Sequence, residues 1–312
     1  MKDFSEPDVV IYHGNCSDGY ASKFICQKKW GNTPAYIAKG HSKNLDVKDI
    51  DFEYKGKNIL FVDFIYDNKD IMEEINNNAK NLLIIDHHLT GMEKYKDSQF
   101  KDKIIYDVNK SACVLLWETL YPNQKIPLIL KYVEDRDLRR WKMPHVNEVL
   151  SVLDTLPKER EQWNIFNNNL ENNLTEIVQK GILIKHVFNG YLQTILMQKK
   201  EIEIQGYTGA VVNTSWEFTS YAADALAEKY DFGMAWFLDS KNMVKCSLRS
   251  KKGLSVKNIA ELFGGGGHFD NAGCTISLSE LEHILNNNYH LVHVKIDEKK
   301  IHEPIILKRK MG

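Results

Sequence analysis

The sequence predicts an α/β fold in two domains, an N-terminal domain built on a parallel sheet and a smaller C-terminal α/β domain. The chain has 312 residues, more than one ordinary domain needs. Its first half alternates short apolar runs with helix-like segments, which favours parallel strands joined by crossover helices. A second strand-and-helix series follows an Asn-, Lys- and Glu-rich helical stretch near residues 158–200. We therefore expect domains over 1–185 and 201–312, joined by a helical linker over 186–200.

The elements of the first domain follow from apolar periodicity. Strands are predicted over residues 8–13, 58–64 and 81–88. Helices are predicted over 18–30, 68–80 and 110–121. Ser111 is expected to act as the N-cap of the last helix.

The second domain begins with a strand over 209–214 and a helix over 220–230. Further elements are two strands over 233–239 and 243–250, a helix over 256–263, a glycine loop and a strand over 272–278. The tail from residue 291 is expected to pair as a strand and to end in basic residues.

Composition excludes several classes of protein. The 41 Lys and Arg residues nearly balance the 42 Asp and Glu residues, so no extended track for duplex DNA is expected. The sequence has no apolar run long enough to span a membrane and no signal-peptide core at its start. The five cysteines are odd in number and form no CxxC pair, which favours a reducing compartment. We therefore expect a cytoplasmic protein.

Polar residues that bind metals follow three of the predicted strands. His13 ends the first, Asp63 ends the second, and Asp86, His87 and His88 end the third. Ligand sites in parallel sheets lie outside the carboxyl ends of the strands, so these side chains are expected to converge. Taken singly, Asp63 could equally cap the next helix, and the two histidines could form a surface turn.

Two further segments add candidate ligands. The turn at residues 12–19, "YHGNCSDG", offers Cys16 and Asp18, although by itself it also fits an ordinary polar loop. The segment "YVEDRDLRRW" at 132–141 offers Asp135 and Asp137, although by itself it fits a solvated charge run. Together the segments supply the ligands of two divalent ions bridged by a carboxylate and a hydroxide. Carboxylates favour Mn²⁺ or Mg²⁺, whereas a cysteine favours softer ions such as Zn²⁺ or Co²⁺.

The second domain offers groups that could bind phosphate. Arg249 and Ser250 can hold a phosphate by forked hydrogen bonds. Four glycines and a histidine follow the helix over 256–263: Gly264, Gly265, Gly266, Gly267 and His268. A glycine run alone is usually a flexible loop, but next to these cationic groups it favours a nucleotide-holding loop. We add Ser111 to the substrate-binding candidates.

These motifs together resemble the DHH–DHHA1 phosphoesterase family over about residues 8–280. The resemblance rests on the triplet at 86–88, the His/Asp motif on the first strand, Asp63, the aspartate near 137 and the GGGGH loop. The compact layout is similar to the nano-RNase and pAp-phosphatase branch. One departure is Cys16, which stands where the first motif commonly has its middle aspartate. In this respect the chain resembles a subset of the family whose first motif has the form HGNCxDG.

The resemblance implies roles for the candidates and a cleft between the two domains. His13 and Asp63 would hold one metal ion. Asp63 would bridge to a second ion held also by Asp18, His87 and either Asp137, which fits the fourth motif better, or Asp135. His88 would contact the scissile phosphate, with Asp86 in support, and the second domain would bind the rest of the substrate.

We therefore expect a metal-dependent phosphodiesterase that hydrolyses short oligonucleotides or linear or cyclic dinucleotides. It is expected to use two divalent ions, with Mn²⁺ as the first candidate. The alternatives are a pAp phosphatase or exopolyphosphatase on the same scaffold, and a non-catalytic nucleotide-binding module. The sequence leaves the oligomeric state open, with a homodimer as one alternative. It also does not decide between RNA, DNA and cyclic dinucleotides.

Overall fold

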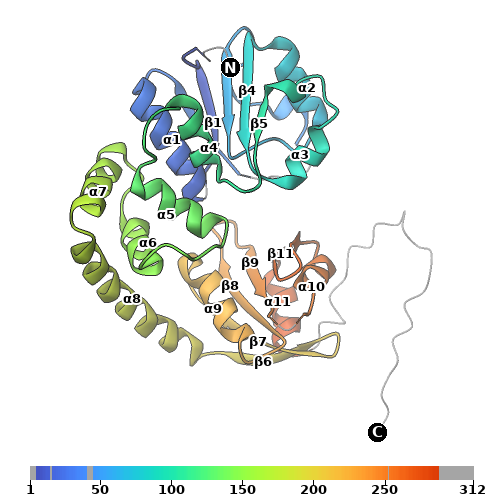
Figure 1. The fold of residues 1–312 in the computed structure, drawn as a ribbon. Coiled ribbons are helices and arrows are strands. Elements are labelled where there is room, and N and C mark those ends of the chain that lie inside the picture. The colour runs from blue at the N-terminus through green and yellow to red at the C-terminus, as the bar shows by residue number, and fades with distance from the viewer. Residues whose placement is uncertain (1–4, 15, 41–44, 252, 288–312) are drawn as a thin grey trace. The chain divides into compact units, whose positions relative to one another are not determined.

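A computed structural model describes residues 5–14, 16–40, 45–251 and 253–287 of the chain. The chain divides into two compact units, Met1–Lys185 and His186–Gly312 (Figure 1). Each unit combines a sheet with helices, which confirms the predicted α/β class. Among the described residues no helix combines the length and the apolar character needed to cross a membrane. The tail from residue 291, predicted to pair as a strand, lies outside the described residues.

The first unit contains a five-stranded parallel sheet in the order β2-β1-β3-β4-β5, as far as the described residues show. Its strands are β1 (Val9–His13), β2 (Ala35–Lys39), β3 (Asn58–Val62), β4 (Asn81–Asp86) and β5 (Ile104–Tyr106). Its helices are α1 (Ser17–Trp30), α2 (Lys69–Asn78), α3 (Leu89–Tyr95), α4 (Ala112–Leu120), α5 (Leu128–Asp137), α6 (Val146–Thr155) and α7 (Arg160–Asn172), followed by α8 (Leu174–Leu196). This strand order is that of a doubly wound sheet, in which ligands bind where the winding reverses beside β1.

Helices cover both faces of this sheet, which explains why its strands are apolar at nearly every position. Val10 and Leu60 face a core formed with α1, α4, α5 and the helices after them. Ile11 and Phe61 face a second core formed with α2 and α3. Figure 1 shows α1 and α4 on one side of the strands and α2 and α3 on the other.

The second unit contains a six-stranded mixed sheet in the order β10-β11-β9-β8-β7-β6, again over the described residues. Its strands are β6 (Lys200–Ile204), β7 (Tyr207–Asn213), β8 (Phe232–Leu238), β9 (Val244–Arg249), β10 (Gly266–Gly267) and β11 (Asn271–Ile276). Its helices are α9 (Thr219–Ala227), α10 (Val256–Leu262) and α11 (Leu278–Leu285), with a 3₁₀ turn at Trp216–Phe218. α10 and α11 pack on one face of the sheet, and α9 packs on the other with the last turns of α8.

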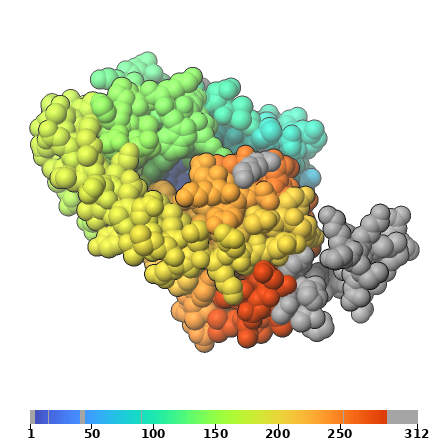
Figure 2. Space-filling view, turned by 90° about the horizontal axis from the view of Figure 1, so that it is seen from below, coloured from blue at the N-terminus to red at the C-terminus, as the bar shows by residue number. Residues whose placement is uncertain are grey.

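α8 is one continuous helix through the segment that was expected to be a linker. Its C-terminal residues Leu192, Ile195 and Leu196 pack against the core under α9. Earlier positions such as Leu183 and Tyr191 remain exposed, and the helix lies at the surface of the molecule (Figure 2).

The structure corrects one local prediction, the glycine loop. Gly266 and Gly267 instead form the short strand β10 and pair antiparallel with Gly273 and Ala272 of β11. Several elements were also missed: β2, β5, β6, α3, α5, α6 and α11. Weak apolar patterns explain some of these omissions, since β2 is an edge strand with exposed positions and β5 has only three residues.

Candidate metal centre

The carboxyl edge of the parallel sheet carries the candidate site. β1 ends at His13, β4 ends at Asp86, and Asp63 follows the last residue of β3. These three strands are neighbours and run parallel, so their carboxyl ends meet at one edge. The structure therefore brings side chains from three separate segments into one cluster.

Asp63 lies at the centre of this cluster. Its backbone is left-handed, with φ of 57°, a conformation that aspartate tolerates better than most residues. The carboxylate is 1% exposed and accepts a hydrogen bond from Sγ of Cys16 at 2.9 Å. Three imidazole nitrogens lie near it: Nδ1 of His13 at 3.5 Å, Nε2 of His87 at 3.5 Å and Nδ1 of His88 at 3.8 Å. Burial would raise the pKa of Asp63, but the contacts with these imidazoles and the thiol lower it below its ordinary value.

Asp18 enters the cluster from the first turn of α1. Gly19, the next residue, allows the start of α1 to pack closely against the end of β1. A Cβ atom at this position would lie 2.1 Å from the carbonyl oxygen of His13. The Asp18 carboxylate is buried and accepts hydrogen bonds from the backbone N–H groups of Ala112 at 2.7 Å and Cys113 at 2.9 Å. Asp18 therefore caps the start of α4 while one of its oxygens remains near the cluster.

Ser111 occupies the N-cap position of α4, as predicted, but its side chain makes no capping hydrogen bond. The expectation that its hydroxyl caps the helix is wrong, because Asp18 supplies the acceptor instead. The hydroxyl lies 3.2 Å from Sγ of Cys113, and the residue is fully buried. Ser111 therefore has no exposed surface through which it could contact a substrate.

His87 and Asp137 each bring an unsatisfied atom to the cluster. Nε2 of His87 lies 3.3 Å from Oδ2 of Asp137 and 3.8 Å from Oδ2 of Asp18. Among the described residues, neither Nε2 of His87 nor Oδ2 of Asp137 has a hydrogen-bond partner, although both atoms are buried. Burial and the Asp63 carboxylate also raise the pKa of Asp137, because its negative charge is poorly compensated there.

Asp135 has a different role from Asp137. Its two oxygens accept hydrogen bonds from the backbone N–H groups of Lys142 and Met143, each at 3.0 Å. The residue is 4% exposed, so these bonds tie the loop after α5 to the end of the helix. Of the two predicted candidates, the structure places Asp137 in the cluster and Asp135 in a loop-holding position.

Asp86 holds His88 in one orientation. Its Oδ1 atom lies 2.7 Å from Nδ1 of His88 and accepts a hydrogen bond from the backbone N–H of His87 at 2.7 Å. The hydrogen bond to Asp86 raises the pKa of His88 to about 9. The His88 side chain is 40% exposed, in contrast to that of His87 at 10%. The two adjacent imidazoles therefore differ in environment, one inside the cluster and one at its surface.

Cys16 occupies the N-cap position of α1. Its sulfur accepts a hydrogen bond from the backbone N–H of Gly19 at 3.1 Å and donates one to Asp63. Burial and the neighbouring carboxylate raise the pKa of this thiol, so the metal-free site favours the neutral form.

The donor set fits divalent cations. Three groups of side chains place one ligand atom each within 4.8 Å of one another: Asp63, Asp86, His87 and His88; His13, Cys16 and Asp63; Asp18, His87 and Asp137. Burial and the carboxylates of Asp63 and Asp137 raise the pKa of Asp18 to about 8, which reflects uncompensated negative charge. A cation would compensate this charge and satisfy the unpaired atoms of His87 and Asp137. Carboxylates suit Mn²⁺ or Mg²⁺ and imidazoles suit ions such as Zn²⁺, so this mixed donor set fits divalent ions as a class.

The predicted substrate-binding residues lie in the second unit. Arg249, at the end of β9, donates hydrogen bonds to Oγ of Ser247 and Oγ of Ser220, both at 2.9 Å. Ser250 is buried and donates to the carbonyl oxygen of Leu254 at 2.5 Å, so its hydroxyl holds the following loop.

The glycine segment is a tight turn between α10 and β11. Gly264 and Gly267 adopt positive φ angles of 71° and 144°. A Cβ atom at Gly265 would lie 2.2 Å from the carbonyl oxygen of Gly273, so this segment packs directly on β11. His268 follows in an exposed position, and its backbone N–H donates to the carbonyl oxygen of Asn271 at 2.7 Å.

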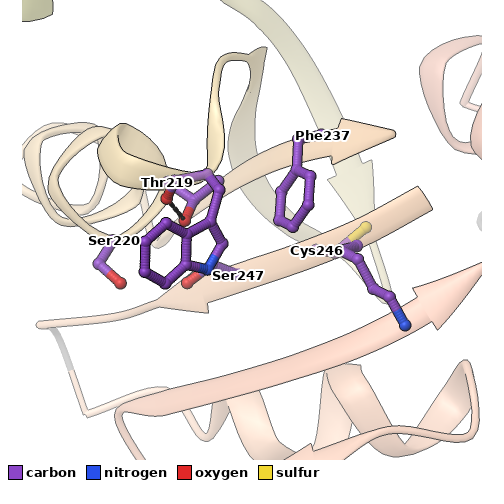
Figure 3. A pocket seen from close by; sticks show the side chains of 7 residues that line it. Thr219, Ser220, Phe237, Cys246 and Ser247 are labelled. Atoms are coloured by element: carbon purple, nitrogen blue, oxygen red, sulfur yellow. Dashed lines mark hydrogen bonds between the residues drawn. The ribbon is translucent and has the colours of Figure 1, made fainter. Parts of the chain in front are cut away.

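The second unit contains a pocket that the sequence did not predict. It lies beside Arg249 and is lined in part by Trp216, Ser220 and Phe237 (Figure 3). Its walls come from a turn, a helix and two strands, so only strand pairing brings them together. The aromatic residue Trp216, two positions after the strand predicted over 209–214, is the one local signal that could have indicated it.

The chain resembles known proteins in sequence and in fold. The DHHA1 domain family matches residues 206–291. The uncharacterized protein R106 of Acanthamoeba polyphaga mimivirus is 31% identical over 294 residues, covering 86% of this chain and 68% of that protein.

Solved structures share the fold at low sequence identity. A pGpG-specific phosphodiesterase, PggH from Vibrio cholerae, superposes with a TM-score of 0.51 at 13% identity, covering 90% of this chain and 97% of that one. The DHH domain of a member of the s1p family of ribosomal proteins gives 0.56 at 13% identity, with coverages of 92% and 87%. RecJ from Thermus thermophilus, in complex with Mn²⁺, gives 0.51 at 11% identity, with coverages of 91% and 52%.

Proposed function

Because residues 206–291 match the DHHA1 domain family, we propose that the chain is a DHH–DHHA1 family member and a metal-dependent phosphodiesterase acting on short oligonucleotides or dinucleotides. The observation that carries this proposal is the buried cluster of carboxylates and imidazoles at the carboxyl edge of the parallel sheet. The names of two similar structures, a pGpG-specific phosphodiesterase and a Mn²⁺ complex of RecJ, agree with this chemistry. The compact two-unit layout favours the nano-RNase and pAp-phosphatase branch.

Two divalent ions, Mn²⁺ foremost, would be held by the clustered residues. His13, Cys16 and Asp63 would hold one ion, and Asp18, His87 and Asp137 would hold the other. The Asp63 carboxylate, 3.5 Å from both His13 and His87, would contribute to both sites. When bound, the ions would supply the acidification of water and the neutralisation of phosphate charge that phosphodiester hydrolysis requires.

The chain's own residues would position the substrate and move protons. In the metal-free protein the hydrogen bond to Asp86 raises the pKa of His88 to about 9, which favours an imidazolium that can donate a hydrogen bond to a phosphate oxygen. Asp86 would keep the ring in the orientation that this contact needs, because its Oδ1 atom lies 2.7 Å from Nδ1. The backbone N–H groups at the start of α4 would hold the Asp18 carboxylate in position to bind a metal ion.

The second unit would bind the rest of the substrate through Arg249 and the segment Gly264–His268. The near-neutral net charge of −1 favours short substrates, because long polyanions reward an extended basic surface. The odd number of cysteines and the lack of a CxxC pair favour a reducing compartment such as the cytoplasm.

The test is release of mononucleotide from the dinucleotide pApA with and without Mn²⁺. We expect turnover with Mn²⁺, loss on chelation, and loss of at least about 10³-fold in Asp63→Ala, because that variant removes the central ligand. Asp67→Ala is the matched control, since Asp67 is an exposed aspartate four residues away that pairs with Lys94. Absence of turnover with every divalent ion tried, or parent-like activity in Asp63→Ala, contradicts the proposal. Faster phosphate release from pAp than cleavage of pApA would instead favour the phosphomonoesterase alternative.

A further inference from the structure

The second unit contains a pocket of about 390 Å³ between the turn at Trp216–Phe218, the start of α9 and the facing strands β8 and β9. This volume lies at the lower end of the range of about 300–1,000 Å³ for small-molecule sites. Figure 3 shows Thr219 and Ser220 on the helix side and Phe237 across from them over the strands. The pocket is therefore sized for one small ligand rather than for an extended chain.

Two aromatic side chains line this pocket. Trp216 is 63% exposed, although an indole is among the most favourable side chains to bury. The turn that carries it is held by a hydrogen bond from Oγ1 of Thr219 to its carbonyl oxygen at 2.8 Å. Phe237 is partly buried on the strand side. An exposed aromatic ring on a fixed turn beside a second ring is suited to stacking a flat, unsaturated ligand.

Polar groups occupy the side of the pocket next to β9. Lys245, Ser247 and Arg249 alternate along this strand and therefore share one face. The Arg249 guanidinium donates to the hydroxyls of Ser220 and Ser247, which both line the pocket. Its Nε atom also lies 3.8 Å from the half-exposed carboxylate of Asp224, so these contacts together hold the cation at the pocket's edge. A ligand that fills the pocket would place an aromatic group against the rings and an anionic group near the guanidinium.

We propose that this pocket binds the nucleobase of a terminal nucleotide of the substrate, with the attached phosphate directed toward Arg249. The inference rests on the proposed function and specifies how that substrate is held. Serine hydroxyls both donate and accept hydrogen bonds, so the pocket is expected to accept more than one base. Stacking on aromatic rings is likewise tolerant of base identity.

The experiment measures binding of AMP and of ribose 5-phosphate to the full-length chain in EDTA by titration calorimetry. These two probes differ only in the base. We expect AMP to bind at least about tenfold more tightly than ribose 5-phosphate, as base stacking implies. Trp216→Ala should abolish this preference without changing the affinity for ribose 5-phosphate, and Trp216→Phe should retain most of it. Tyr207→Ala is the matched control, because Tyr207 is an exposed aromatic residue of the same unit outside the pocket.

Equal affinity of the parent protein for the two probes, absence of AMP binding, or an unchanged preference in Trp216→Ala overturns the inference. Mn²⁺-dependent cleavage of pApA is assayed in parallel. Cleavage without a preference for AMP would refute the base pocket and leave the proposed function standing. A Trp216-dependent preference without any cleavage would refute the proposed function and leave the base pocket standing.

Discussion

Nε2 of His87 lies 3.3 Å from Oδ2 of Asp137, and both atoms are buried without a hydrogen-bond partner among the described residues. Buried polar atoms are normally satisfied, so such a pair needs a further ligand. Asp135, two positions earlier, has both oxygens occupied by backbone N–H groups. Two aspartates of one helix turn therefore have separate roles, one open to a cation and one structural.

The first prediction separates these two aspartates. Asp137→Asn is expected to lower Mn²⁺ affinity and pApA cleavage by about 100-fold or more, with little loss of stability, because it removes a ligand charge. Asp135→Asn is expected to lower the free energy of unfolding by about 1–3 kcal/mol while Mn²⁺ affinity changes little, because one backbone donor loses its acceptor. Titration calorimetry and urea denaturation measure the two effects. The reverse pattern would transfer the ligand role to Asp135.

The second prediction concerns pH and the metal-free protein. The pKa of Asp18 is raised to about 8 by burial and nearby carboxylates, and that of His88 to about 9 by its hydrogen bond to Asp86. A group with a raised pKa in the folded state holds its proton there after the unfolded chain has released it. Stability is therefore lost as pH rises, from about 4 to 8 for Asp18 and from about 6.5 to 9 for His88.

Urea denaturation in EDTA at pH 6 and pH 9 measures this effect. We expect lower stability at pH 9, and a smaller difference in Asp18→Asn and in the presence of saturating Mn²⁺, because each removes or compensates the buried charge. A metal-free protein that is equally stable at both pH values would contradict the raised pKa values of Asp18 and His88.

The third prediction concerns metal choice at Cys16. Cys16→Asp keeps an acceptor for the backbone N–H of Gly19 and adds a carboxylate beside Asp63, so the affinity ratio should shift toward Mn²⁺ and away from Zn²⁺. Cys16→Ser preserves the cap without the sulfur and should weaken Zn²⁺ binding alone. Competition titrations with the two ions measure the ratio. An unchanged ratio in both variants would exclude the sulfur as a ligand.

The fourth prediction concerns the pair Asp86 and His88. His88→Asn is expected to reduce kcat for pApA by about 10²–10⁴-fold, the usual range for a positioned proton donor. Asp86→Asn should lower the pKa of His88 toward its ordinary value, because the hydrogen bond between the Asp86 carboxylate and the His88 ring is the main cause of the upward shift. NMR titration of the His88 ring in the metal-free protein measures the second effect. A His88 pKa that stays near 9 in Asp86→Asn would show that other charges control it.

The fold was predictable where apolar patterns are strong. The strands that hold His13, Asp63 and Asp86 are buried on both faces and stand out in the sequence. The edge strand β2 and the helix α5 were missed, the latter because its charged end looked like a solvated segment. The apolar residues Ile129 and Val133 of α5 lie in the core of the first unit.

The candidate site was predictable as a list of residues but not as a set of contacts. Strand ends in a parallel sheet share an edge, so the meeting of His13, Asp63 and His87 follows from local patterns. The capping of α4 by Asp18 does not follow from local patterns. Asp18 lies 94 positions away from Ala112, and no local sequence feature indicates that its carboxylate accepts a hydrogen bond there. The chain itself suggested Ser111 for this role, and packing excluded it.

The sequence alone indicated the strongly apolar elements and the residue types at their ends, because apolar periodicity and strand termini are local properties. Only the tertiary structure distinguished the surroundings of Asp135 from those of Asp137, and it replaced Ser111 with Asp18 as the cap of α4. It also placed Trp216 and Phe237 on the same pocket as Ser220 and Ser247. The physical reason is that burial and hydrogen-bond satisfaction depend on which segments pack together, and distant parts of the chain supply those partners.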